Sequence, residues 1–172
     1  LSGTTDTNTI SASGSVELAN VVDTGTTTAT SPVELVVTAG TGVTLGTVTL
    51  SNTLDVDFDT ATGTSTLNAG SLSAGTIEVD GVGTNDVMNF GSTVVSTVAG
   101  VTIGNAGTVD LDGDVTGATT VTISDVGTEI DLAAGVDITA SGGNVDLNNT
   151  VAQIDLSGTT DTNTISASGS VE

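Results

Sequence analysis

The chain repeats its own beginning. Residues 1–17, LSGTTDTNTISASGSVE, return letter for letter as residues 156–172, so the two copies start 155 residues apart. A run of identities this long does not arise by chance. We therefore interpret residues 1–155 as one unit of a tandem array and residues 156–172 as the start of the next identical unit. Such an array predicts a fold in which every unit continues into its neighbour along one axis.

Triplets in which one polar residue separates two apolar residues recur along the chain, for example Leu54-Asp55-Val56 and Val101-Thr102-Ile103. This alternation is the signal of a short strand with one buried face. Turn dipeptides such as Thr-Gly, Asp-Gly and Gly-Gly lie between the triplets, and the 23 glycines interrupt every window long enough for a helix. The sequence therefore predicts an all-β fold.

The triplets group into coils. Coil starts are placed at Val16, Val33, Leu54, Ile77, Val101, Val121 and Val145. The next start is Val171, the counterpart of Val16, so about seven coils of roughly 22 residues close one period in register. Second strands are expected at Val43, at the stretch Ser65-Thr66-Leu67, at Met88-Asn89-Phe90, and at Val109, Ile130 and Ile154. We expect a parallel β-solenoid (a β-helix) around a column of Val, Ile and Leu; a third strand in each coil, and eight coils of about 19 residues, are open alternatives.

Charge excludes several classes of partner. The chain has no Lys, Arg or His, and its 21 Asp and Glu residues give a formal net charge of −21. Nucleic acid is excluded because its binding depends on basic residues that neutralise phosphates. Membrane insertion is not expected, because no apolar run approaches the roughly 18 residues of a spanning helix. The hydrophobic content of 36% argues against a disordered acidic tail.

Catalytic chemistry is poorly supplied. Without His, Cys, Lys, Arg or Tyr, carboxylates are the only candidate acid–base groups. A polysaccharide lyase needs a cationic residue beside its substrate, and a glycosidase usually needs aromatic platforms, whereas this chain has two Phe and no other aromatic residue. We expect no enzyme activity, no catalytic residue and no cofactor-binding residue.

Two groups of carboxylates are candidates for cation binding. Asp110, Asp112 and Asp114 alternate like the start of a calcium loop. The loop pattern requires Gly and Glu where this chain has Val115 and Val121, so a solvated strand face is the simpler interpretation.

The second group follows from the predicted stacking. In the predicted register Glu17, Glu34, Asp55 and Glu78 point outward from four successive coils. Neighbouring strands are about 4.8 Å apart, so each adjacent pair repels by roughly 0.9 kcal/mol in water. With no basic residue to pair with them, relief must come from diffuse counter-ions, raised pKa values or bound divalent cations, of which Ca²⁺ is the one we expect.

Two segments, GVTIGNAGTVDLDGDVTGATTVTI (Gly100–Ile123) and GVDITASGGNVDLNNTVAQIDLSG (Gly135–Gly158), carry a resemblance to a known family. Their texture resembles the repeats of filamentous-haemagglutinin-like exoproteins and other giant bacterial adhesins. The resemblance is one of style and carries no signature motif or active-site residue. It implies a secreted, right-handed parallel β-helix in a long fibre at the cell surface.

These observations predict a structural module of an extracellular filament or surface appendage, whose partners are adjacent copies of itself, end to end. The copies are either covalent repeats of a giant chain or separate stacked subunits, and the duplicated segment favours the first. The alternative function is an adhesin shaft or binding module that recognises a surface, glycan or protein. Ice binding by Thr-x-Thr arrays is a weaker alternative, because these motifs do not recur once per coil.

Overall fold

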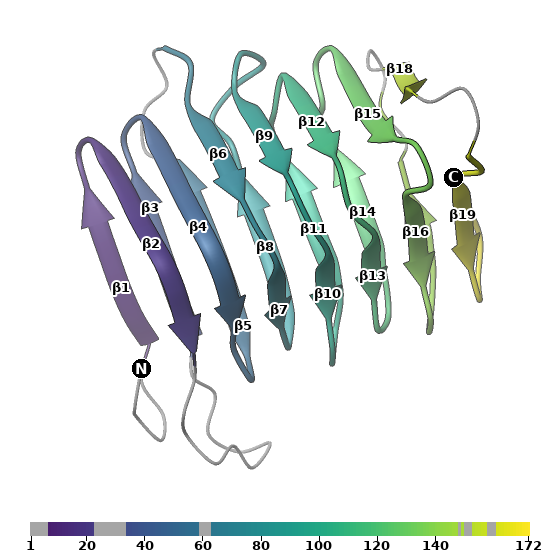
Figure 1. Ribbon diagram of the computed structural model, residues 1–172, viewed down its shortest axis with the longest axis horizontal. Helices are drawn as coiled ribbons and strands as arrows, with labels where there is room; N and C mark the ends of the chain where they lie inside the picture. The colour runs from purple at the N-terminus through teal and green to yellow at the C-terminus, as the bar shows by residue number, and fades with distance from the viewer. Residues whose placement is uncertain (1–6, 23–33, 59–62, 148, 150–152, 158–160) are drawn as a thin grey trace.

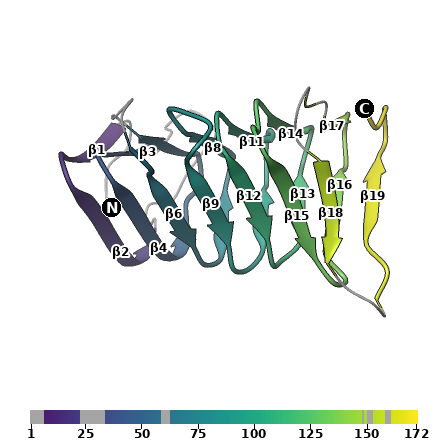
Figure 2. The same ribbon diagram turned by 90° about the horizontal axis from the view of Figure 1, so that it is seen from above.

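The computed structural model describes residues 7–22, 34–58, 63–147, 149, 153–157 and 161–172. Within these residues the regular elements are all strands, and every strand pairing is parallel. The strands stack coil upon coil, with the N-terminus at one end of the stack and the C-terminus at the other (Figures 1 and 2). The expected all-β parallel β-solenoid is confirmed. No helix long and apolar enough to cross a membrane occurs in the part of the chain that the structure describes.

Each coil has three strand faces, so the structure contains the third strand per coil that the sequence left as an open alternative. The first face is the seven-stranded sheet β1 (Thr7–Ala12), β3 (Glu34–Ala39), β5 (Thr53–Phe58), β8 (Thr76–Asp80), β11 (Val101–Gly104), β14 (Val121–Ser124) and β17 (Val145–Asp146). The second face contains β6 (Thr66–Ala69), β9 (Val87–Phe90), β12 (Thr108–Leu111), β15 (Glu129–Ala133) and β18 (Gln153–Ser157). The third contains β7 (Leu72–Ala74), β10 (Val94–Ser96), β13 (Val115–Gly117), β16 (Asp137–Ala140) and β19 (Thr164–Ala167).

Two long strands join the second and third faces. In β4 (Gly42–Thr49), Val43 lies opposite Leu67 of the second face, whereas Val48 lies opposite Leu72 of the third. Strand β2 (Ser15–Val22) runs beside β4 over its whole length. The second and third faces therefore form one twelve-stranded sheet, which β4 connects.

The predicted register is confirmed from Leu54 onward. On the first face Leu54, Ile77, Val101, Val121 and Val145 lie in one column, and Val171 continues it through an isolated bridge to Val145. The expected second strands also lie in one column, which is Val43, Leu67, Met88, Val109, Ile130 and Ile154. Successive coils along the first face are 23, 24 and 20 residues long between Val56, Val79, Ile103 and Ile123.

The first two predicted coil starts are wrong. Val16 lies in β2 opposite Val43, on the second face. Leu35 is the residue opposite Leu54, and Val33 lies outside the described residues. The first-face strand of the coil that contains Val16 is β1, in which Ile10 lies opposite Val37. Strand β1 escaped prediction because its sequence, TNTISA, contains no triplet of large apolar residues around a polar one.

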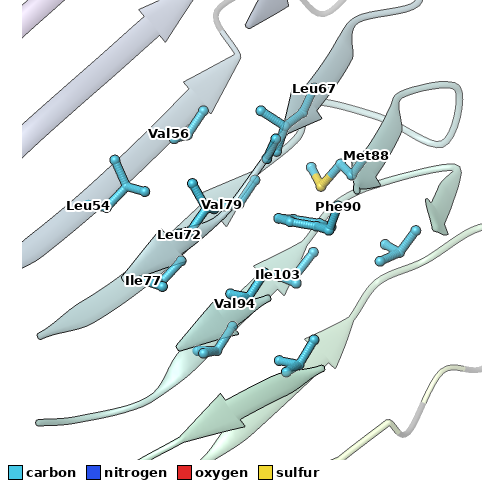
Figure 3. Close-up of a cluster of buried hydrophobic side chains, with 14 of the residues drawn as sticks. Leu54, Val56, Leu67, Leu72, Ile77, Val79, Met88, Phe90, Val94 and Ile103 are labelled. Atoms are coloured by element: carbon cyan, nitrogen blue, oxygen red, sulfur yellow. The ribbon is translucent and has the colours of Figure 1, made fainter. Parts of the chain in front are cut away.

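A column of aliphatic side chains fills the coils. Leu54, Leu67, Ile77 and Phe90 are all fully buried, and they point from facing strands toward the same interior (Figure 3). Burial of one such side chain stabilises the fold by about 1.5–3 kcal/mol. Since every coil adds the same kind of residue to the column, stacking buries the apolar face that a single coil leaves exposed.

The corner after β8 provides a matched pair of glycines. A Cβ atom on Gly81 would overlap the carbonyl oxygen of Asn105 in the next coil, whereas a Cβ on Gly83 would meet nothing within 4 Å. We expect Gly81→Ala to lower the free energy of unfolding by about 2 kcal/mol. We expect Gly83→Ala to leave it unchanged or raise it slightly. Urea unfolding of both variants measures the difference, and equal losses would contradict the stacking of these corners.

Candidate functional site

The predicted ladder of four carboxylates is only half correct. Asp55 and Glu78 are direct neighbours on β5 and β8, as predicted. Glu17 lies on the second face opposite Thr44, because Val16 and its neighbours belong to that face. Glu34 lies opposite Thr7 and two residues before Val36, which is the residue opposite Asp55. The outward residues of the first two coils therefore do not extend the column.

The structure instead brings together four carboxylates on the first face. Asp55 pairs with Glu78 and Asp57 pairs with Asp80, so two adjacent coils each contribute two acidic side chains. We call these four residues the acidic patch. They line a surface depression together with Thr102. The sequence prediction included Asp55 and Glu78 in the ladder. It interpreted the alternation of Asp57 with Asp55 as a solvated strand face and did not include Asp80, although Asp80 alternates with Glu78 in the same way.

Crowding in the acidic patch changes its protonation. Burial, followed by the repulsion of Asp57, Glu78, Glu34 and Asp80, raises the pKa of Asp55 to about 6. Burial and the neighbouring Asp80 also raise the pKa of Asp57. Asp80 accepts a hydrogen bond from a neutral side chain, since Asn105 donates its side-chain N–H to Asp80 at 2.6 Å. The patch is therefore a set of like charges with no cationic side chain to pair with in the whole sequence.

A second polar column runs along the second face. It reads Asn68, Asn89, Asp110, Asp131 and Asp155 in successive coils. The two asparagines form an amide ladder, in which Asn89 Nδ2 donates to Asn68 Oδ1 at 2.9 Å. The three aspartates repeat the middle position of the triplets VDL, IDL and IDL, and this regular spacing was a signal for the column that sequence reasoning did not use.

The pKa of one carboxyl group in this column is raised as well. Burial, then Asp112, Asp131 and Glu129, raise the pKa of Asp110. The Oδ1 atom of Asp131 is buried and has no hydrogen-bond partner among the described residues. Asp131 as a whole is only partly buried.

The predicted cluster Asp110, Asp112 and Asp114 does not form one site. Asp110 lies on β12, whereas Asp112 and Asp114 lie in the corner between β12 and β13. Asp114 accepts a hydrogen bond from the backbone N–H of Asp137 at 2.9 Å, and Asp137 accepts one from Thr164 at 2.9 Å. Asp114 therefore holds the corner of the next coil. Among the described residues, no group of three or more acidic side chains is arranged to hold a metal ion.

Asp86 is a structural carboxylate that sequence reasoning missed. Its side chain is 2% exposed and accepts hydrogen bonds from the backbone N–H groups of Ser65 at 2.8 Å, Val82 at 2.8 Å and Gly83 at 3.2 Å. A buried carboxylate requires such partners, because a charge away from water is otherwise strongly destabilising. Asp86 therefore ties the corner after β8 to the preceding coil.

No known protein family matches the chain, and neither a curated protein nor a solved structure is detectably similar to it. The stacked carboxylates are thus the chemically distinctive feature of the described surface. They present negative charge in columns along the stack.

The raised pKa of Asp55 predicts a pH-dependent stability. Its folded-state value of about 6 exceeds the ordinary value of 3.8, so the native state binds this proton more tightly than the unfolded chain does. Stability therefore falls as the pH rises from about 4 to about 6, and the loss is complete above that window. We expect Asp55→Asn to raise Tm by roughly 2–4 °C near neutral pH, since water screens the partly exposed charge, and to flatten the Tm profile across the window. Asp161→Asn, an exposed change of equal charge, is the control; identical profiles for both variants would contradict the assignment.

Cations provide a second test of the acidic patch. Screening of like charges should raise Tm as ionic strength increases. If diffuse counter-ions suffice, CaCl₂ and NaCl of equal ionic strength give equal increases, which is the result we expect. The predicted bound Ca²⁺ instead requires a larger increase in CaCl₂ that chelation reverses and that the double variant Asp55→Asn/Asp57→Asn abolishes.

Proposed function

We propose that the chain is a repeat module of an extracellular filament or long surface appendage, and that it performs no catalysis. The observation that carries the proposal is the recurrence of residues 1–17 as residues 156–172 at the two ends of one continuous stack of coils. Among the described strands, β1 and β19 each pair with a single neighbour, and a stack that ends in this way is suited to continuation because edge strands accept further strands.

The mechanical role follows from the direction of the hydrogen bonds. On the first face the N–H groups of Ile77, Val101, Val121 and Val145 each donate to a carbonyl of the following coil, at 3.0–3.1 Å. The last of these bonds reaches Ser170, inside the second copy of the repeated segment. Many such bonds act in parallel along the axis of the stack, so a pulling force is shared among them.

Surface composition supports the same role. A net charge of −21 makes neighbouring fibres repel one another and favours solubility. The absence of Lys and Arg removes every cleavage point for trypsin-like proteases, which suits a chain outside a cell. We further propose, from the resemblance of residues 100–123 and 135–158 to filamentous-haemagglutinin-like repeats, that the module belongs to a giant bacterial surface protein.

Among the described residues, no observation favours the adhesin-shaft alternative. Phe58 is 6% exposed and Phe90 is fully buried, so these two residues, the only aromatic ones, offer no platform for a glycan. Whether the copies are covalent repeats or stacked subunits is decided by the size of the native material under denaturing conditions. A very large species supports a covalent array, whereas a species near 16.6 kDa supports stacked subunits.

Electron microscopy of chains with one, two and four copies of the 155-residue unit tests the proposed function. Successive coils are about 4.8 Å apart, and the strands from β1 to its counterpart β19 span six coils and two further faces. We therefore expect thin unbranched rods that lengthen by about 32 Å with each copy. Compact particles whose longest dimension does not increase with copy number would contradict it.

A further inference from the structure

The two copies of the repeated segment lie on different faces of the solenoid. In the first copy Ile10 lies on the first face, opposite Val37. In the second copy its counterpart Ile165 lies on the third face, opposite Ile138. The next strand shows the same change, since Val16 lies on the second face and Val171 is bridged to Val145 of the first. From β1 to β17, both on the first face, the chain completes six coils. It then passes β18 on the second face and reaches β19 on the third, so the counterpart of β1 lies six coils and two faces further on.

The local structure of the segment is nevertheless similar in both copies, since residues 9–12 and their counterparts 164–167 are both strands. The pattern of exposed and partly buried side chains over residues 7–15 is repeated over residues 162–170. Ile10 and Ala12 pack against the core in the first copy, and Ile165 and Ala167 do so in the second. The segment is therefore one unit, a strand followed by a Ser-Gly corner and a residue, Val16 or Val171, that bridges to the neighbouring coil, and this unit has been turned by one face.

The segment matches two different corners in sequence. Its residues ISASGSVE align without a gap to VTAGTGVT (residues 37–44), which lies beside the first copy at the corner between the first and second faces. They align with one inserted residue to ITASGGNVD (residues 138–146), which lies beside the second copy at the corner between the third and first faces. The segment can therefore pair with the corner of residues 37–44 through one side and with the corner of residues 138–146 through the other.

Backbone hydrogen bonds secure both contacts. Beside the second copy, Gly169 N–H donates to Gly143 O at 2.8 Å and Glu172 N–H donates to Val145 O at 3.0 Å. Beside the first copy, Gly40 N–H lies within hydrogen-bond distance of Ala12 O at 3.0 Å and Gly14 O at 2.9 Å. The second copy is thus held from the side of residues 138–146, and the side that residues 37–44 occupy in the first copy is open at the end of the stack.

We propose that this open end binds the counterparts of residues 34–49 from the next copy of the repeat, and that each copy is consequently turned by one strand face relative to the copy before it. The inference rests on the proposed role as a tandem module and specifies its junction. It replaces the expected closure of each period by seven whole coils. Three copies, which comprise twenty coils and about 96 Å, restore the original face.

Exposed apolar residues at the C-terminal end fit this occupant. Val16 is 6% exposed because β4 covers it, whereas its counterpart Val171 is 51% exposed. Ile154 and Leu156 on β18 are 43% and 57% exposed. In the first copy the chain passes from Val16 to Val21 on the third face. After a turn by one face, the counterpart of Val21 lies on the second face, over β18.

Charge gives a smaller preference in the same direction. Had the second copy kept the faces of the first, Glu172 would stand above Asp155 and extend the column of Asp110, Asp131 and Asp155 to four carboxylates. In the structure Glu172 follows Val171 on the first face, next to Asp146. Without the turn, Glu172 would also be repelled by Asp131, the carboxylate beyond Asp155, and this adds only about 0.4 kcal/mol in water. The fit of the corners therefore decides the register.

Engineered disulfides in the 172-residue chain test the turn directly, because the chain has no cysteine. Thr139 and Ser166 are paired, with their hydroxyl oxygens 3.1 Å apart, so Thr139→Cys/Ser166→Cys should oxidise to an intramolecular disulfide. Asp155 and Glu172 are neighbours only without the turn, so Asp155→Cys/Glu172→Cys should form at least about tenfold less intramolecular disulfide. Asp131→Cys/Asp155→Cys is the positive control. The reverse ranking of the first two pairs overturns the inference.

A chain lengthened by a further copy of residues 18–172 tests the occupant. Ser11 lies opposite Thr38, so Ser166→Cys should form a disulfide with a cysteine at the counterpart of Thr38 in the added copy. Images of chains with many copies should show each copy rotated by one face per axial step of about 32 Å. Rods without this rotation, or without the disulfide, overturn the inference and leave the proposed function intact. Chains that form no rods contradict the proposed function instead.

Discussion

Parallel hydrogen bonding between successive coils is the interaction on which the rest of this structure depends. It fixes the register, so that each column of side chains carries one role, either in the core or on the surface. Leu54, Ile77 and Val101 share an inward column, whereas Asp55, Glu78 and Thr102 share the adjacent outward one. In the described part of the chain β1 and β19 each pair with a single neighbouring strand, and a stack that ends in such strands is suited to continuation.

The same stacking places like charges beside one another. Each adjacent pair of carboxylates repels by roughly 0.9 kcal/mol in water, whereas each buried Leu or Ile stabilises by about 1.5–3 kcal/mol. The core column therefore outweighs the charged columns. Burial, together with the repulsion of the neighbouring carboxylates, raises the pKa of Asp55 to about 6.

Much of the architecture could be predicted from the sequence, because period-two triplets report a half-buried strand wherever they occur. They do not report which face a strand occupies. Val16-Glu17-Leu18 resembles every first-face triplet, yet it lies on the second face. The prediction for Glu34 is two residues out of register because Val33-Glu34-Leu35 has the apolar-polar-apolar pattern of a triplet. Leu35-Val36-Val37, which actually pairs with Leu54-Asp55-Val56, is apolar throughout and gives no such signal.

The parts of the candidate site that escaped prediction depend on contacts between coils. Asp86 is a single residue in a corner, and its role requires three backbone N–H groups that no sequence period reveals. The acidic patch required the correct pairing of Asp57 with Asp80 as well as of Asp55 with Glu78. The third strands were predicted only as an alternative, because Leu72-Ser73-Ala74 and its equivalents are short and contain small residues.

The central claim is that the stack of coils continues through the junction between copies. Amide hydrogen exchange at residues 164–172 tests it most directly, in the 172-residue chain and in a chain that continues into a further copy. The account predicts fast exchange at the open end and, in the longer chain, protection equal to that of β11 and β12. Exchange that stays fast when the next copy is present would show that the coils stop at the junction and would contradict the account.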